Sequence, residues 1–115
     1  MTRPNDAFIW NLVHTWPKLD DVVRYNLEEA GGVLLPHLVL SDVMRWLVDH
    51  LHDDREECEA LLAWIGHQYD AASDEVKDLI AVSGVEMLPD PDEPGGAELR
   101  ALLPPNLRGL DPWLI

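Results

Sequence analysis

Two stretches of the chain carry apolar residues at the three- and four-residue spacing of one helix face. The first predicts a helix over about 41–51, with Ser41 expected at its N-cap. Its stripe consists of Leu40, Val43, Met44, Leu47, Val48 and Leu51. The second predicts a helix over about 55–69, and its stripe consists of Cys58, Leu61, Leu62, Ile65 and Tyr69. Both helices should turn these stripes toward the core.

Weaker patterns predict two helices before residue 33. A first short helix is expected to begin at Asn5 or Asp6, whose side chains can accept a hydrogen bond from a helix N-terminus. A second helix is expected over about 19–27, and Gly31–Gly32 should end it because glycine enters the left-handed conformation cheaply. The apolar segment 33–38 is interrupted by a proline, and it therefore predicts a buried extended connector rather than a strand.

The C-terminal part predicts two more helices and the longest loop. Ser73 is expected to start a helix that continues to Met87, and the proline-rich run 89–96 should end it. A last short helix is expected over 97–103. The tail 113–115 is apolar, and we expect it to pack on the core because apolar ends left in water are a liability.

Consecutive amphipathic segments without an alternating strand pattern predict an all-α fold. We expect a compact antiparallel bundle, or a short two-layer array, of about five to six helices. With 115 residues and 47% hydrophobic residues, the chain is long and apolar enough for one core, so we interpret residues 1–115 as a single acidic helical domain.

Acidic residues are concentrated in the middle of the chain. The formal net charge is −14, and residues 42–98 hold sixteen Asp and Glu against Arg45, Arg55 and Lys77. Such a field repels nucleic-acid phosphates and anionic lipid, and it speeds encounters with basic protein surfaces. We therefore expect a basic protein as partner, and neither direct nucleic-acid binding nor membrane binding. A second interpretation stays open, in which the charge mainly keeps a small protein in solution.

The densest acidic patch and two tryptophans are the candidate partner-binding residues. Six acids fall within eleven residues of the chain and are accompanied only by Arg55. Two tryptophans lie at the border of the apolar stripes, where this residue either anchors an interface or covers the edge of a small core. The candidate residues are Trp46, Asp49, Asp53, Asp54, Glu56, Glu57, Glu59 and Trp64. Trp10, Trp16 and Trp113 are expected to close the two ends of the bundle.

The residues give little support to catalysis, a metal site or a cofactor, and we expect none of the three. Cys58 is the single cysteine and lies on an apolar helix face, so we interpret it as a core residue. His50 and His52 are two positions apart and point to different sides of a helix, unlike the i, i+4 pair of a zinc-binding helix. One cysteine, no apolar leader and no membrane-spanning run favour the cytoplasm.

Two segments of the chain are GVLLPHLVLSDVMRWL at 32–47 and DLIAVSGVEMLP at 78–89. They are similar to the leucine-proline-histidine turn, the aspartate-arginine-tryptophan helix and the late helix of one family, and the chain thereby resembles a family of small acidic all-helical bacterial proteins of unknown function. The family's members resemble immunity or accessory proteins encoded beside toxin genes, which implies toxin neutralisation. Gly84 departs from the pattern, because a bulky residue stands there in the family.

Three hypotheses of function follow. The first is a non-enzymatic immunity-type inhibitor that neutralises a bacterial toxin through an acidic helical face. The second is a DNA-mimicking inhibitor of a nuclease, restriction or CRISPR component, because carboxylates spaced along helices imitate a phosphate track. The third is a small accessory subunit or an uncharacterised enzyme. A toxin gene beside this one would favour the first hypothesis, and a prophage context would favour the second. The oligomeric state is left open.

Overall fold

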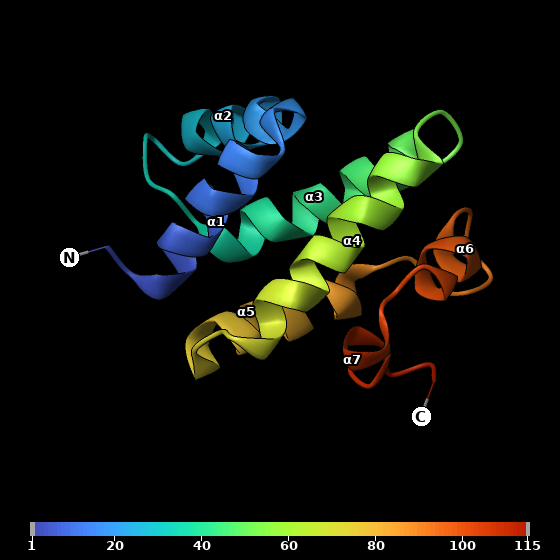
Figure 1. Ribbon diagram of the computed structural model, residues 1–115. Helices are drawn as coiled ribbons and strands as arrows, with labels where there is room; N and C mark the ends of the chain where they lie inside the picture. The colour runs from blue at the N-terminus through green and yellow to red at the C-terminus, as the bar shows by residue number, and fades with distance from the viewer. Residues whose placement is uncertain (1, 115) are drawn as a thin grey trace.

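Seven α-helices and two 3-10 turns form the computed structural model, which describes residues 2–114 and has no strand in that range (Figure 1). The all-α prediction is therefore confirmed. The α-helices are α1 (Pro4–Thr15), α2 (Asp20–Glu29), α3 (Pro36–His50), α4 (Arg55–Asp70), α5 (Asp74–Ser83), α6 (Gly96–Ala101) and α7 (Pro105–Arg108). The 3-10 turns are η1 (Pro17–Leu19) and η2 (Val85–Met87). The four-residue helix α7 was not predicted.

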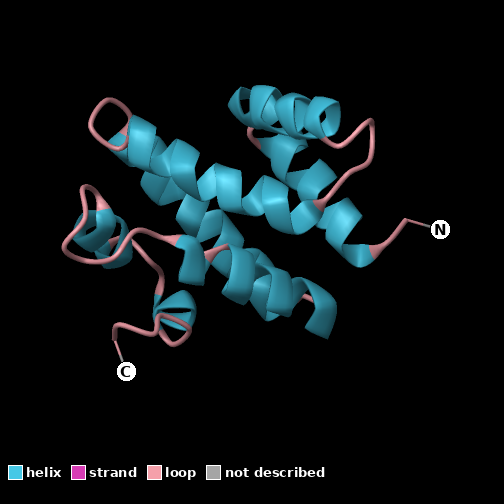
Figure 2. Cartoon of the chain, turned by 180° about the vertical axis from the view of Figure 1, so that it is seen from behind, coloured by secondary structure: helices cyan, strands magenta, loops and turns pink. Residues whose placement is uncertain are grey.

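Helix α3 is the centre of the fold. It packs against α1, α2, α4, α5 and α6, while α6 and α7 form a C-terminal group beside α3 and α4 (Figures 1 and 2). Its predicted stripe is confirmed, because all but the half-buried Val48 are buried. The stripe of α4 is confirmed in the same way, with Cys58 fully buried and Tyr69 half-buried. Burying a side chain such as Leu47 stabilises the fold by roughly 1.5–3 kcal/mol.

Proline begins α3 five residues earlier than predicted. Pro36 occupies the first turn, where its missing N–H costs nothing. Ser41 is therefore not a cap but a residue within the helix, and its hydroxyl donates to the carbonyl of His37 at 2.9 Å. The prediction of a buried connector at 33–38 is also wrong, since Val33 and Leu38 are 57% and 56% exposed.

The start of α1 differs from the prediction, whereas the end of α2 agrees with it. Pro4 begins α1 and Arg3 is the residue before it, so Asn5 and Asp6 lie inside the first turn and do not cap the helix. Gly31–Gly32 ends α2 as predicted: both residues have positive φ, 64° and 89°. The N–H of Gly32 donates to the carbonyl of Leu27 at 2.7 Å, which satisfies a carbonyl of the last turn.

Helix α5 begins where predicted and ends earlier. The hydroxyl of Ser73 accepts a hydrogen bond from the N–H of Val76 at 3.4 Å, which confirms the cap. The helix ends at Ser83, four residues before the predicted Met87, because Gly84 leaves the helical conformation with φ −104° and ψ −88°. The chain then continues as η2, so the proline-rich run does not end α5.

The C-terminal tail and two tryptophans are more exposed than predicted. Trp113 and Leu114 are 55% and 57% exposed, so the tail does not pack as expected up to residue 114, and Ile115 lies outside the described residues. Trp10 is 47% exposed and does not close an end of the fold, whereas Trp16 is half-buried against the core. Of the described helices, none is both long enough and apolar enough to cross a membrane.

Candidate protein-binding surface

The predicted acidic patch lies at one corner of the fold, where α3 turns into α4 (Figure 1). Asp49 is in the last turn of α3, and Asp53 and Asp54 are in the connecting turn and at its end. Glu56, Glu57 and Glu59 follow in the first turns of α4. The acids exposed to solvent are Asp49, Asp53, Glu56 and Glu59, whereas Asp54 and Glu57 are half-buried. We call Asp49, Asp53, Asp54, Glu56 and Glu59 the acidic face.

Glu57 has a structural role and is therefore left out of the acidic face. Its carboxylate accepts a hydrogen bond from Lys18 Nζ at 2.6 Å, and this ion pair joins η1 to the start of α4. The hydrogen bond and the charge of Glu57 raise the pKa of Lys18. The sequence could not separate Glu57 from its neighbours, because its partner lies 39 residues earlier in the chain.

The basic side chains near the acidic face are bound elsewhere. Arg55 contacts Glu98 at 3.5 Å, and Arg45 pairs with Asp42. Among residues 2–114, no ion pair involves a carboxylate of the acidic face. The negative charge at this corner is thus left to solvent or to a partner.

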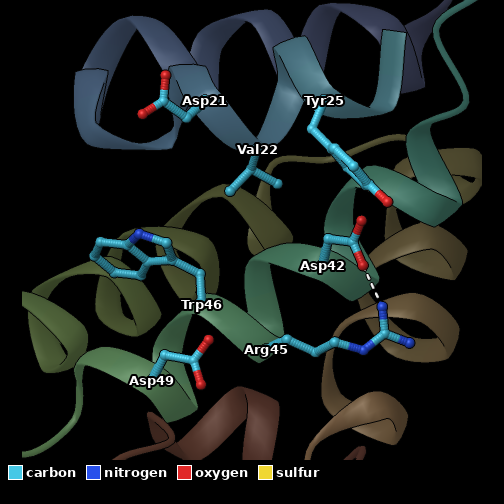
Figure 3. A pocket seen from close by; sticks show the side chains of 7 residues that line it. All are labelled: Asp21, Val22, Tyr25, Asp42, Arg45, Trp46 and Asp49. Carbon is cyan, nitrogen blue, oxygen red and sulfur yellow. Dashed lines mark hydrogen bonds and ion pairs between the residues drawn. The ribbon is translucent and has the colours of Figure 1, made fainter. Parts of the chain in front are cut away.

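A groove between α2 and α3 adjoins the acidic face through Asp49. Its volume is about 330 Å³. Figure 3 shows Val22 and Tyr25 extending from α2 toward α3, whereas the Asp21 side chain lies along α2 and points away from Trp46. The other side chains come from α3. The seven lining residues are Asp21, Val22, Tyr25, Asp42, Arg45, Trp46 and Asp49.

The three carboxylates that line the groove differ in their hydrogen bonds and ion pairs. Asp42 is already engaged, because it accepts hydrogen bonds from Arg45 and, at 2.9 Å, from the side-chain amide of Asn26. Asp21 and Asp49 are exposed, and neither makes a side-chain hydrogen bond or ion pair with a described residue. Asp21 and Asp49 are therefore the two carboxylates among the lining residues that have no counter-charge from a described residue.

Trp46 stacks on a neighbouring ring at the edge of this groove. Its indole stacks on the imidazole of His50, with ring centroids 4.1 Å apart and an angle of 17° between the planes. His50 Nδ1 in turn donates to the carbonyl of Trp46 at 2.8 Å. The ring is half-buried and lines the groove, so its position at the border of core and surface agrees with the predicted one.

Trp64 lies elsewhere. It is half-buried on α4 and packs on Phe8 of α1, with ring centroids 5.8 Å apart. It does not line the groove that contains Trp46. The two tryptophans selected from the sequence are therefore not brought together. Sequence reasoning missed Asp21, Tyr25 and Asp42, because nothing in the spacing of the two segments shows that α2 lies across α3.

One contact has the residue types of a catalytic pair. His37 Nδ1 is 2.5 Å from the hydroxyl oxygen of Ser83, and Ser41 donates to the Ser83 carbonyl at 3.4 Å. Ser83 is only 5% exposed, so its hydroxyl is covered by the protein. The contact serves to join the start of α3 to the end of α5.

Residues 11–110 match the model of a family described as a domain of unknown function, DUF7674. The chain belongs to this family. The match includes α2, α3 and the acidic face, and it also includes both segments on which the resemblance was based. A search of curated proteins found no match, and a search of solved structures found none either.

Proposed function

We propose that this member of the DUF7674 family is a non-enzymatic binding module that takes a basic protein on its acidic face. The proposal rests on one observation, which is that the carboxylates at the corner between α3 and α4 lack counter-charges. Five carboxylates lie there without an ion-pair partner among the described residues, while Arg45 and Arg55 are bound to other acids. A basic partner would supply the missing counter-charges.

The charge of the acidic face also indicates which classes of partner it would repel. Uncompensated carboxylates attract a basic surface over several ångströms, to about 8 Å at physiological salt, and raise its rate of association. The same charges repel nucleic acid, whose affinity for proteins depends on neutralising phosphates. The proposed partner is therefore a protein rather than DNA, RNA or an anionic membrane.

The finer role that we propose is immunity in the cytoplasm, meaning neutralisation of a bacterial toxin. It is supported by the resemblance to small acidic proteins encoded beside toxin genes. DNA mimicry would use the same acidic face on a protein that binds nucleic acid. The two roles differ in the partner, so identifying the partner distinguishes them.

The experiment is affinity capture from the native host with three baits of matched fold. The first is the natural protein. The second carries Asp53→Lys, Glu56→Lys and Glu59→Lys, which reverse exposed positions of the acidic face and spare Glu57. The third carries Glu28→Lys, Glu29→Lys and Glu86→Lys, three exposed acids elsewhere, so that its net charge matches that of the second.

We expect the natural protein and the third bait to retain the same basic protein, and the second bait to lose it. Elution by salt should follow the same order. Equal retention by all three baits would contradict the proposal, because binding would then be independent of the acidic face. If the captured protein is toxic and the natural protein blocks its activity, the immunity role is supported. Displacement of the captured protein by DNA supports mimicry instead.

A further inference from the structure

We infer that a pocket between α6 and the C-terminal segment binds a small apolar carboxylic acid, with its carboxylate on Arg108 and its apolar part against Trp113. The pocket shares no residue with the acidic face, and the inference goes beyond the protein-binding role proposed above. The occupant is a monoanion that carries one ring or a short alkyl chain.

This C-terminal pocket has a volume of about 480 Å³. It lies at the end of the fold where Figure 1 shows α6, α7 and the last residues of the chain gathered together. Five of its seven lining residues are apolar and none is acidic; they are Pro91, Ala97, Arg100, Ala101, Arg108, Trp113 and Leu114. Apolar walls with a few polar groups, around roughly 300 to 1,000 Å³, are typical of sites for small ligands.

Arg108 supplies a positioned cation that has no counter-charge. Its Nε donates to the carbonyl of Leu103 and its Nη2 to the carbonyl of Ala101, both at 2.8 Å, so the guanidinium is held on the end of α6. Ala101 itself lines the pocket, which places the guanidinium at the pocket wall. Among residues 2–114, Arg108 makes no ion pair and its Nη1 makes no hydrogen bond.

Arg100 also lines the pocket, but its charge is already matched. It is only 4% exposed and forms an ion pair with Asp111. The pocket therefore has one uncompensated positive charge, and this favours a monoanion as the occupant. A phosphate would bring a second negative charge, for which the lining residues offer no further cation.

The apolar walls are positioned by the fold. Ala97 and Ala101 are four positions apart, so they lie on the same face of α6. The N–H of Trp113 donates to Asp111 Oδ1 at 3.0 Å, and the N–H of Leu114 donates to the Asp111 carbonyl at 3.1 Å. These bonds tie the C-terminal segment to a fully buried residue, while both apolar side chains remain more than half exposed. A ligand in the pocket would cover part of that apolar surface.

A carboxylate is the anion that best matches the free side of Arg108. A guanidinium presents its N–H donors in one plane, and the two oxygens of a carboxylate can accept from that plane together. Such hydrogen bonds between charged groups are stronger than those between neutral groups. Because the rest of the lining is mainly hydrocarbon, the remainder of the ligand has to be apolar.

The test compares phenylbutyrate with phenylbutanamide, its neutral amide, which has the same apolar part. Nuclear magnetic resonance of the ¹⁵N-labelled protein follows the indole N–H signals, and Trp113→Phe identifies the signal of Trp113. We expect phenylbutyrate to shift this signal and the amide signals of Ala97 and Ala101. It should bind at least about tenfold more tightly than phenylbutanamide, because only the acid forms charge-assisted hydrogen bonds.

Variants of the two arginines test the role of the cation. Arg108→Gln should weaken the binding of phenylbutyrate by about tenfold or more and leave that of phenylbutanamide nearly unchanged. The matched control is Arg24→Gln, which removes an exposed cation from α2, outside the pocket, and should leave both affinities unchanged.

A second pair of variants tests the pocket without changing charge. Ala97→Leu fills the pocket from an exposed position of α6 and should abolish binding of both compounds. Leucine is nearly as good a helix former as alanine, so the helix should persist. Ala63→Leu, at an exposed position of α4 outside the pocket, is the control and should bind both compounds as the natural protein does.

Three results would overturn the inference. They are equal affinities for phenylbutyrate and phenylbutanamide, a Trp113 signal that neither compound shifts, and an effect of Arg24→Gln as large as that of Arg108→Gln. None of them bears on the acidic face, so the failure of this inference leaves the proposed function standing.

Discussion

Arg100 and Asp111 form a buried ion pair that joins α6 to the C-terminal segment. Their exposed fractions are 4% and 0%. The Nη1 of Arg100 donates to Asp111, while Nε and Nη2 donate to the carbonyl of Pro89 at 3.1 and 2.9 Å. Nη2 also donates to the carbonyl of Leu88 at 3.0 Å. One guanidinium thus connects three segments of the chain.

Removing one member of this pair should be far more costly than removing an exposed ion pair. Arg100→Met leaves a buried carboxylate without a counter-charge, and we expect a loss of about 3–5 kcal/mol in the free energy of unfolding. The double variant Arg100→Met/Asp111→Leu should recover a large part of it. Urea denaturation of each variant measures the effect.

The matched control for this pair is on α2. Arg24→Met breaks the exposed pair with Asp20 and should cost no more than about 1 kcal/mol. Equal losses for Arg100→Met and Arg24→Met would mean that the buried pair does not stabilise the C-terminal segment.

The buried ion pair shows which part of the fold the sequence could not predict. Apolar spacing predicted α3 and α4 correctly, because a helix face repeats within a few residues and needs no knowledge of its neighbours. Arg100 lies in the short helix predicted over 97–103 and Asp111 in the segment after it, and nothing in either segment indicates that these two charged side chains are buried. The start of α3 was missed for a different reason. Proline breaks the interior of a helix but is over-represented in its first turn, and the spacing around Pro36 does not distinguish the two positions.

Only a part of the candidate surface could likewise be predicted from the sequence. The acidic face could be predicted because its carboxylates lie close together along the chain. The roles of Glu57 and Trp64 could not, since they depend on Lys18 and Phe8 from distant helices. The groove was also beyond prediction, because it exists only where α2 crosses α3.

Gly84 is required at the end of α5 because a side chain would meet the backbone there. A Cβ at this position would lie 2.4 Å from the carbonyl oxygen of Ile80. We expect Gly84→Ala to destabilise the fold by about 1–3 kcal/mol, since the backbone must shift. Gly109→Ala is the control, because its nearest neighbour would be at 3.6 Å and its φ is −63°. Thermal unfolding of both variants tests this, and similar midpoints would argue against the contact.

Cys58 should make stability depend on pH above neutrality. Burial raises the pKa of its thiol, and the charges of Asp54 and Glu57 raise it further. The folded state therefore keeps the proton while the unfolded thiol loses it above a pKa of about 8.5. Stability from this group is complete below that pH and falls as pH rises. Relative to Cys58→Ala, the natural protein should lose stability between about pH 7.5 and about pH 9.5, by no more than about 1.4 kcal/mol.

Urea denaturation of the natural protein and of Cys58→Ala at both pH values measures this difference, and the variant cancels the contributions of all other groups. A thiol reagent gives a second readout. Cys58 is fully buried, so it should react slowly in native buffer and fast in denaturant. Equal reaction rates in the two conditions would show that α4 does not bury this residue.

The acidic face should act mainly on the rate at which the partner associates. Reversing Asp53, Glu56 and Glu59 to lysine should slow association by about tenfold or more and change dissociation less, because long-range attraction acts on the encounter. Added salt should slow the natural protein steeply and the variant weakly. Glu56 is in the first turn of α4, so its reversal also costs about 0.3–1 kcal/mol of stability, which circular dichroism can follow. Stopped-flow mixing with the captured partner measures both rates.

The variant reversed at Glu28, Glu29 and Glu86 has the same net charge, and it should associate faster than the variant of the acidic face. Identical association rates for the two variants would show that only total charge matters and would leave Trp46 and its groove as the surface to test.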